Sequence, residues 1–412
     1  MQPLKRDELR EYINNGENSS VEFKLDTVDN YKLAQEIVAF ANFLGGILLL
    51  GVADDGTIAG LTRPNLEEWI VELCRVKIDP PLIPIYEVHR DFEPGKDVAV
   101  VRILPGPNKP YARWHDNRRV YFIRVGSSSR EADTDKLERM FQESGRLRFG
   151  LKPVPGSGLA DLDRRRLQDY FGRVLLSDYP DQQDSREWER LLINLELMAG
   201  AEAGTVATVD GILLFGVNPK RFLPQAGIRA IAYAGDEPDY PTRADQDLNG
   251  PILPLYDADG KLAATGLIEQ ALDFVNRNTQ PSAMLVAGRR EDISAYPPEA
   301  LREVIVNAVA HRDYARTGAD ILLVIFEDRL EVTSPGRLPN SATIESIKTG
   351  LRYARNQTLV NILRDYRYVD ARGMGIRNKV IPGMRKHNGT EPDFIATEHS
   401  FTVRLWRKNK PG

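Results

Sequence analysis

Three polar residues recur at every fourth position within residues 297–314: Glu303, Asn307 and His311. Two prolines open this segment and apolar residues at helical spacing follow, which predicts an amphipathic helix. At this spacing the three polar side chains share one face of the helix. A carboxylate with an amide one turn later suits a nucleotide–metal site, because the carboxylate can activate a water and the amide oxygen can hold Mg²⁺. The alternative is an ordinary solvated helix face.

Two predicted strands and two glycine-containing segments follow this helix. Residues 321–326 and 329–333 are predicted as strands on either side of a turn, and the second strand leads into Ser334-Pro335-Gly336. Further along, Arg372-Gly373-Met374-Gly375 opens another predicted helix. Glycines before a helix let phosphates approach backbone N–H groups at the positive end of the helix dipole.

The order of these elements resembles the GHKL ATPases, and most of all the divergent branch labelled RecG-like C-terminal ATPase. This resemblance implies ATP as cofactor and a set of site residues: Glu303 as general base, Asn307 as Mg²⁺ ligand, Gly336 in the first glycine box, and Gly373 and Gly375 in the second. The sequence departs from the family at residues 333–336, where Thr-Ser-Pro-Gly replaces the usual Asp that reads the adenine amino group. Hydrolysis of ATP and sensing without hydrolysis therefore both stay open.

The segment 339–372 occupies the position of the GHKL nucleotide lid. Its residues could reach phosphates from above or could simply be solvated: Lys348, Gly350, Arg352, Arg355 and Asn356. We include Arg355, together with His311, among the predicted cofactor-binding residues.

Residues 1–147 carry a second series of ordered motifs. Alternation and apolar runs predict strands at residues 21–24, 47–52, 98–103 and 120–125. Residues 31–43 are predicted as an amphipathic helix. With the turn at Asp54-Asp55-Gly56 and the segment from Tyr121 to Arg130, these motifs resemble the Schlafen AlbA-type domain.

The resemblance implies a domain that binds RNA or DNA, and some members of the family are metal-dependent RNA nucleases with three acidic residues. Glu17, Glu22 and one of Asp54 or Asp55 match that triad. Such carboxylates could hold Mg²⁺ or Mn²⁺ ions that polarise a phosphate and deprotonate water. Lys24 falls on the same strand face as Glu22 and could orient the water. An acidic hairpin turn and surface glutamates without a catalytic role are the alternative.

The segment from Arg102 to Arg130 is strongly basic, with seven Arg or Lys residues against the single acid Asp116, and aromatic residues are interleaved. Basic side chains neutralise phosphates and aromatic rings stack on unpaired bases. A solvated basic face above core aromatics is the alternative. The candidate nucleic-acid contacts are Arg113, Arg118, Arg119, Arg124, Ser127 and Arg130.

Composition limits the protein class. The 412 residues are long enough for two or three domains, and a net charge of −4 excludes a uniformly basic coat. The single cysteine, Cys74, excludes an internal disulfide and a cysteine-based zinc site. No apolar run is long enough to span a membrane, so we expect a cytoplasmic protein without membrane contact.

The expected fold class is α/β (α+β multidomain). We predict an N-terminal Schlafen AlbA-like α/β domain (1–147), a Pro/Gly-rich linker (148–160), a helical or mixed middle connector that could carry a homodimer contact (161–290) and a C-terminal GHKL-like α/β sandwich (291–408). Within the connector we expect helices near 162–175, 186–199 and 263–276, and strands at 211–217 and 228–233.

The preferred hypothesis is a nucleotide-gated nucleic-acid-binding protein. In it, ATP bound at one site controls a domain that binds RNA or DNA and could cleave it. The alternative is a non-catalytic, nucleotide-sensing transcriptional regulator that binds DNA. The sequence contains no G-x-x-x-x-G-K-[ST], so a P-loop helicase motor is not expected.

Overall fold

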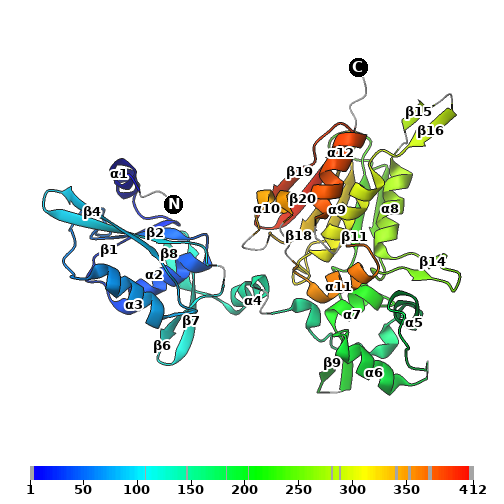
Figure 1. The fold of residues 1–412 in the computed structure, drawn as a ribbon, viewed down its shortest axis with the longest axis horizontal. Coiled ribbons are helices and arrows are strands. Elements are labelled where there is room, and N and C mark those ends of the chain that lie inside the picture. Colours follow the sequence, from blue (N-terminus) through cyan, green and yellow to red (C-terminus); the bar gives the residue numbers. More distant parts are fainter. Residues whose placement is uncertain are drawn as a thin grey trace. The chain divides into compact units, whose positions relative to one another are not determined.

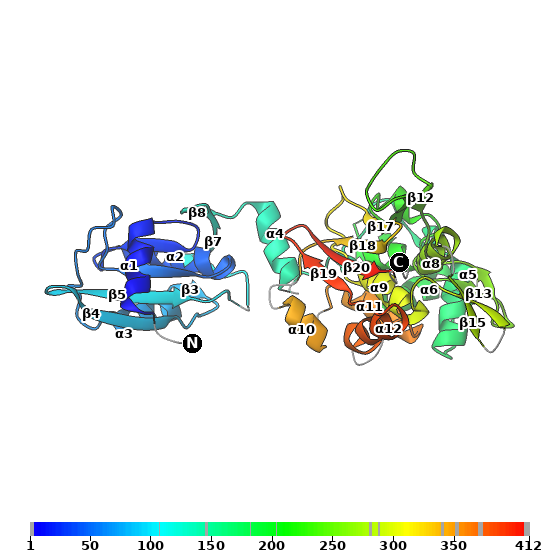
Figure 2. The ribbon, with the colours of Figure 1, turned by 90° about the horizontal axis from the view of Figure 1, so that it is seen from above.

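The computed structural model describes residues 4–106, 108–144, 147–181, 183–202, 204–279, 282–286, 289–338, 342–350, 354–369 and 374–407. The chain divides into two compact units, Met1–Leu147 and Arg148–Gly412 (Figures 1 and 2). Both units mix helices with sheets, so the predicted α/β fold class is confirmed. Among the described residues no helix combines the length and apolar character needed to cross a bilayer.

Two four-stranded sheets form the first unit. The first sheet has the order β1-β2-β5-β4, with bounds Val21–Lys24, Gly46–Leu50, Lys96–Ile103 and Ile85–Glu93. The second has the order β3-β6-β7-β8, with bounds Ile78–Asp79, Ala112–His115, Arg118–Val125 and Ser128–Glu131. The helices of this unit are α1 (Arg6–Asn15), α2 (Asn30–Asn42), α3 (Leu66–Val76) and α4 (Thr134–Glu143).

Helix α2 connects the parallel strands β1 and β2 and packs against strands of both sheets. On β2, Leu48 and Leu50 face the core cluster that contains α2, whereas Leu49 faces the cluster that contains α1. Covering both faces of β2 explains why its sequence is a continuous apolar run rather than an alternation.

The second unit is built on a six-stranded mixed sheet in which β11 and β17 run parallel. Its order is β12-β11-β17-β18-β20-β19, with bounds Ala244–Leu248, Ile228–Ala232, Ile321–Ile325, Arg329–Pro335, Ser400–Trp406 and Asp393–Ala396. The helices on one face of this sheet are α8 (Leu267–Asn278), α9 (Pro298–Ala310) and α12 (Ile381–His387) (Figure 1).

Shorter elements complete this unit. The helices are α5 (Arg164–Asp169), the π-helical turn η3 (Tyr170–Val174), α6 (Ser185–Asn194), α7 (Val209–Phe215), α10 (Ile344–Thr349), α11 (Gln357–Asp365) and the π-helical turn η5 (Ile376–Val380), and three single turns are Phe149–Leu151, Leu159–Asp161 and Pro219–Arg221. Three two-stranded ladders are β9 (Met198–Ala201) with β10 (Gly204–Ala207), β13 (Leu255–Tyr256) with β14 (Leu262–Ala264), and β15 (Ser282–Val286) with β16 (Arg289–Ile293).

Residues 211–215 of the segment predicted as a strand (211–217) instead belong to helix α7. Thr208 caps this helix, because its hydroxyl accepts a hydrogen bond from the Gly211 N–H at 3.2 Å. Every residue of α7 is buried. An apolar run buried on all sides lacks the polar positions that separate a helical period from a strand period.

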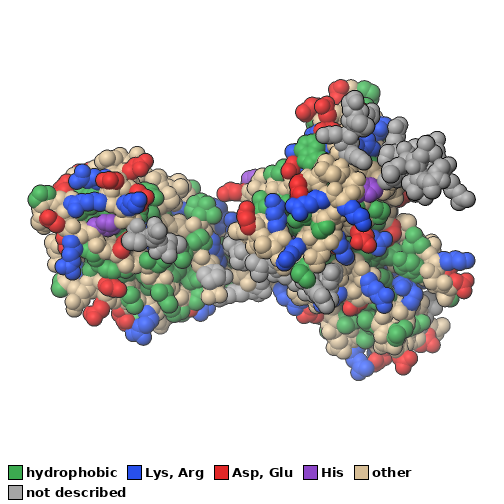
Figure 3. Space-filling view, turned by 45° about the horizontal axis from the view of Figure 1, so that its top comes forward, with side chains coloured by type: hydrophobic (Ala, Val, Ile, Leu, Met, Phe, Trp, Pro, Cys, Tyr) green, Lys and Arg blue, Asp and Glu red, His purple; other side chains and the backbone are tan. Residues whose placement is uncertain are grey.

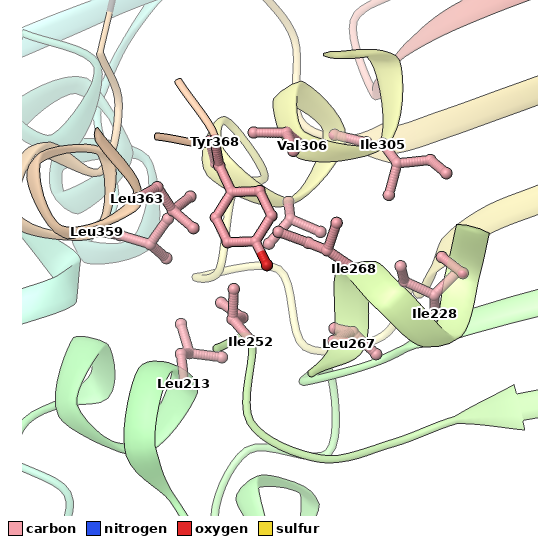
Figure 4. Close-up of a cluster of buried hydrophobic side chains, with 14 of the residues drawn as sticks. Leu213, Ile228, Ile252, Leu267, Ile268, Ile305, Val306, Leu359, Leu363 and Tyr368 are labelled. Carbon is pink, nitrogen blue, oxygen red and sulfur yellow. The ribbon is translucent and has the colours of Figure 1, made fainter. Parts of the chain in front are cut away.

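Residues of the predicted middle region lie within the second unit rather than apart from it. Strands β11 and β12 are hydrogen-bonded into the six-stranded sheet. Helix α8 contributes Ile268 and Phe274 to the same core cluster as Ile305 of α9 (Figure 4). This part of the chain therefore supports the sheet that carries the C-terminal site.

Candidate functional site

Helix α9, strands β18 and β20, and the turn η5 enclose a cavity of about 140 Å³ in the second unit. The predicted polar stripe of α9 lines one end of it through Glu303, Asn307 and His311. The neighbouring stripe, Val304 and Ala308, lines the apolar part. One helix can do both because residues four apart share a face and adjacent residues lie about a quarter-turn apart.

The sheet supplies the apolar floor of this cavity. Val332 of β18 is paired with Val403 of β20, and Ser334 is paired with Phe401. Since residues two apart on a strand point to the same face, all four side chains face the cavity together. A flat apolar floor beside a polar end is the layout that a nucleotide base and its phosphates require.

Glu303 and Asn307 are held together at the polar end. The Asn307 amide donates a hydrogen bond to Oε1 of Glu303 at 3.0 Å. The other Glu303 oxygen lies 3.8 Å from Nζ of Lys379. Because Asn307 uses its NH₂ group on the carboxylate, its carbonyl oxygen is the group it can offer to a cation. Lys379 was missed in the sequence, although a lysine one turn after Gly375 on a phosphate-facing helix was a usable signal.

Both described glycines of the predicted boxes lie at this cavity. A Cβ atom on Gly375 would lie 1.9 Å from Oε1 of Glu303, so a side chain here would displace that carboxylate. Gly336 has φ +115°, and a Cβ there would lie 2.4 Å from a guanidinium nitrogen of Arg355. Gly373 lies outside the described residues.

The predicted lid residues have different roles in the structure. Arg355 lines the cavity, where its guanidinium donates to the backbone carbonyls of His311 at 3.2 Å and Arg337 at 2.6 Å. Asn356 is buried and donates to two carbonyls at the end of α9. Lys348 is placed with its Nζ 5.6 Å from the centre of the Phe394 ring. Arg352 lies outside the described residues.

The cavity residues fit a nucleotide with one bound Mg²⁺. This ion keeps several waters and binds through one or two protein oxygens together with substrate phosphates, so the Asn307 oxygen meets the need from the protein side. The Ser334 hydroxyl donates a hydrogen bond to the Ala308 carbonyl at 2.8 Å. Ser334 also lines the cavity, and a hydroxyl oxygen that donates one hydrogen bond can still accept others.

In the first unit the structure brings the predicted acidic residues together, but around Lys24 rather than around a metal. The Lys24 Nζ lies 2.7 Å from a Glu22 oxygen, 3.5 Å from Glu17 and 3.7 Å from Asp54. Among the described residues no acidic or histidine group of metal-binding geometry occurs. Three carboxylates outnumber the one ammonium, so the group keeps a net negative charge. The predicted metal site at Glu17, Glu22 and Asp54 and the water-orienting role of Lys24 stay predictions, in which a bound ion would compete with the Lys24 ammonium for these carboxylates.

Arg124 is corrected from a nucleic-acid contact to a structural residue. Its side chain is fully buried, and one guanidinium nitrogen donates to Glu22 at 3.0 Å and to Glu36 at 2.8 Å. The other donates to the Asn18 carbonyl at 2.7 Å. Burial raises the pKa of the Glu36 carboxyl, while a hydrogen bond from Ser129 and the charge of Arg124 oppose that rise.

The remaining basic residues are divided between the two faces of the sheet. Arg119 is paired with Trp114 and Arg130 with Ile123 across neighbouring strands, which puts both arginines on the face opposite Arg124. Arg119 also forms a 2.5 Å ion pair with Asp79. Tyr121 belongs to this face as well, since it lies two residues from Arg119.

The other predicted contacts lie elsewhere. Arg113 is half-buried on the inner face, 4.8 Å from the Phe122 ring, and donates to the Tyr31 carbonyl at 3.2 Å. Burial lowers its pKa. Arg118 is exposed at the start of β7, and Ser127 is exposed in the turn between β7 and β8. The structure thus groups Arg119 with Arg130 and separates both from Arg113.

Two family models match parts of the chain. Residues 318–405 match HATPase_c_4, described as "Putative ATP-dependent DNA helicase recG C-terminal", and residues 17–133 match SLFN_AlbA_2, described as "Schlafen, AlbA_2". No curated protein matches the chain.

Two solved structures are similar to the chain. The DIP2311 protein from Corynebacterium diphtheriae is 21% identical with a TM-score of 0.44, over 95% of this chain and 75% of that chain. The N-terminal domain of a putative ATP-dependent DNA helicase RecG-related protein from Nitrosomonas europaea is 23% identical with a TM-score of 0.24, over 32% of this chain and 95% of that chain. With both family models matched, the chain combines a Schlafen AlbA_2 segment with a RecG-like C-terminal HATPase_c_4 segment.

Proposed function

We propose that this protein binds ATP with Mg²⁺ in the second unit and binds nucleic acid through the first, with nucleotide occupancy regulating the nucleic-acid activity. One observation carries the nucleotide part. Glu303, Asn307, Gly336 and Gly375 come from three separate stretches of sequence and all line one cavity. The family matches support the pairing of a nucleotide domain with a nucleic-acid domain.

In this proposal the adenine lies on the apolar floor of the cavity, with its amino group donating to Ser334. The phosphates lie at the polar end, where the Asn307 oxygen holds Mg²⁺ and Lys379 and Arg355 face the negative charge. Glu303 is placed to accept a proton from an attacking water, since its carboxylate lies beside the metal ligand.

Replacing Asn307 with alanine is expected to weaken ATP–Mg²⁺ binding by about 10- to 100-fold, because an interaction with a charged group contributes about 1.5–3 kcal/mol. Isothermal titration of the full chain measures this effect. Asn361→Ala, on the exposed side of α11, is the matched control and should bind as the native chain does. Equal affinity of the Asn307 variant and the control would remove the Mg²⁺-ligand assignment.

For the first unit we propose binding without metal-dependent cleavage. Lys24 lies among the three carboxylates, and Glu22 is also paired with Arg124. The binding surface in this proposal is the sheet face defined by Trp114, Arg119, Tyr121 and Arg130, which offers two cations and two aromatic rings. Cations beside rings suit single strands, in which phosphates and unpaired bases are both accessible.

Replacing Arg119 and Arg130 together with alanine is expected to weaken binding of single-stranded DNA and RNA and to reduce its salt dependence. The slope of log K against log salt is negative, and each lost phosphate contact reduces its magnitude by about 0.7 for a single strand. Losing two contacts therefore reduces the magnitude by about 1.4. Fluorescence anisotropy at several salt concentrations measures the slope. Arg75→Ala, an exposed arginine of α3, is the control. An unchanged slope in the double variant would place the nucleic acid on another surface.

A nucleotide-sensing regulator that never hydrolyses ATP is the second candidate. The serine at position 334, in place of the family's Asp, favours it because it changes the group that reads the base. The position of Glu303 beside Asn307 favours hydrolysis instead. Phosphate release by the native chain and by Glu303→Gln distinguishes these two functions.

A further inference from the structure

A second cavity, of about 370 Å³, lies in the second unit and shares no lining residue with the nucleotide cavity. Three arginines and three tyrosines line most of it: Arg173, Arg302, Arg367, Tyr256, Tyr366 and Tyr368. They come from η3, from α9 and from the loop that follows α11, with Tyr256 on β13. Neither the family matches nor the motifs of the sequence assign a role to this cavity.

Two of the arginines are stacked against tyrosine rings. The Arg173 guanidinium carbon lies 4.3 Å from the centre of the Tyr256 ring and 5.8 Å from that of Tyr366. The Arg302 guanidinium carbon lies 5.6 Å from the centre of the Tyr368 ring. Arg173 already donates from Nε and from one Nη to Asp169. Arg302 is therefore the ring-contacting arginine whose N–H groups can donate to an oxyanion.

The tyrosine wall is fixed from behind by the core. The rings of Tyr170, Tyr366 and Tyr368 form a stack, with centroid separations of 5.8 Å and 6.4 Å. Tyr368 is buried among aliphatic side chains that include Ile268 and Leu363 (Figure 4), and its hydroxyl donates to Glu269. The arginines therefore rest on rings that cannot move freely, which limits the entropy lost when they bind a ligand.

The charges in this cavity are unbalanced. Within the described parts of the chain, Arg302 and Arg367 form no ion pair with a carboxylate. Arg173 is paired with Asp169 at 2.5 Å, and Asp365 lines the cavity while accepting a hydrogen bond from the Tyr170 hydroxyl at 2.8 Å. With Arg173 compensated by Asp169, the two guanidinium groups of Arg302 and Arg367 face the single lining carboxylate of Asp365, which leaves an excess of one positive charge. On the face shown in Figure 3, basic and acidic side chains are interspersed.

We propose that this second cavity binds a phosphate group, carried either by a small phosphate ester or by the backbone of a nucleic-acid strand. Guanidinium groups match phosphate oxygens with two parallel hydrogen bonds, and such charge-assisted bonds are about twice as strong as neutral ones. The phosphate site is independent of the nucleotide assignment, because the two cavities share no lining residue. Arg302 and Glu303 are consecutive in the chain, but each lines a different cavity.

Phenylglyoxal labelling of the native full chain, followed by peptide mass spectrometry, tests the proposal at the level of single arginines. At a probe concentration about ten times the dissociation constant, about nine-tenths of the sites are filled, and labelling of Arg302 and Arg367 slows about tenfold. The two probes are inorganic phosphate and a short oligothymidylate, at equal ionic strength. Arg190, an exposed arginine of α6, is the internal control.

Each outcome decides the matter. Protection by inorganic phosphate supports a site for small phosphate esters, and protection by the oligothymidylate alone supports a strand as the source. The proposal is overturned if neither probe slows the labelling of Arg302 and Arg367, or if the labelling of Arg190 slows to the same extent. In Arg302→Gln the protection of Arg367 should fall at least about threefold if the two residues share one phosphate, since one of the charged contacts to that phosphate is lost. Arg190→Gln should leave it unchanged.

Discussion

Replacing Arg124 with alanine is expected to destabilise the first unit by about 3–5 kcal/mol, because it removes the cation paired with the buried Glu36 and leaves Glu22 with Lys24 alone. Arg124 is fully buried and holds Glu22 on β1, Glu36 on α2 and the Asn18 carbonyl. The Arg124→Ala substitution therefore removes a compensating positive charge and also leaves unfilled volume in the core. Hydrogen exchange of peptides from β1 and α2, measured by mass spectrometry in the full chain, gives the change in opening free energy.

The pH dependence of this variant provides an independent check. The pKa of Glu36 is already above its ordinary value of 4.5 because of burial. Loss of Arg124 removes an interaction that lowers this pKa, so the folded-state pKa rises further. A carboxyl whose pKa is raised by folding contributes stability that is lost as pH rises through that range. The loss of stability in Arg124→Ala, relative to the native chain, should thus be smaller near pH 5 than near pH 8.

Arg118→Ala is the control for this experiment, because Arg118 lies on the same strand but is exposed. Its change in stability should stay within about 0.5 kcal/mol. Adding Glu36→Gln to Arg124→Ala should recover part of the loss, since one uncompensated carboxylate is removed. Equal stability of the Arg124 and Arg118 variants would mean that the buried ion pairs contribute little.

Local patterns predicted most of the elements that carry the site. The 3.6-residue period placed helix α9 and its polar stripe, and apolar alternation placed β1, β17 and β18 close to their observed bounds. The same method gave a strand at α7, where burial on every side removed the polar positions of the pattern. It also gave no sign that residues 228–248 join the C-terminal sheet, since strand partners far apart in sequence leave no local signal.

Side-chain partners were harder to predict than elements. Glu22 and Arg124 are 102 positions apart, so nothing in their spacing indicates that they meet. The same applies to Lys379 and Glu303, which approach because η5 packs against α9. Alternation correctly put Glu22 and Lys24 on one face, but it could not tell whether a lysine or a metal ion would occupy the centre of the acidic cluster. Only tertiary packing decides which charge neutralises which.

Replacing Gly375 with alanine is expected to damage the nucleotide site and to destabilise the second unit by about 1–3 kcal/mol, the usual cost of overpacking. Helix propensity alone predicts the opposite, a gain of up to about 1 kcal/mol, because Gly375 has helical backbone angles. The contact decides the sign, since the new Cβ would lie 1.9 Å from Oε1 of Glu303. Relief requires Glu303 to turn away from Asn307, so ATP–Mg²⁺ affinity in isothermal titration should fall together with the melting temperature.

Gly383→Ala separates the two effects. Gly383 lies inside α12, and a Cβ there would have its nearest neighbour at 3.5 Å, which is an ordinary contact. This variant should therefore show the gain from helix propensity and unchanged nucleotide binding. In the double variant Gly375→Ala/Glu303→Ala the clash is absent, so stability should return toward that of Glu303→Ala alone. If the two changes are instead additive, the close approach of Gly375 to the Glu303 carboxylate is not what makes glycine necessary at this position.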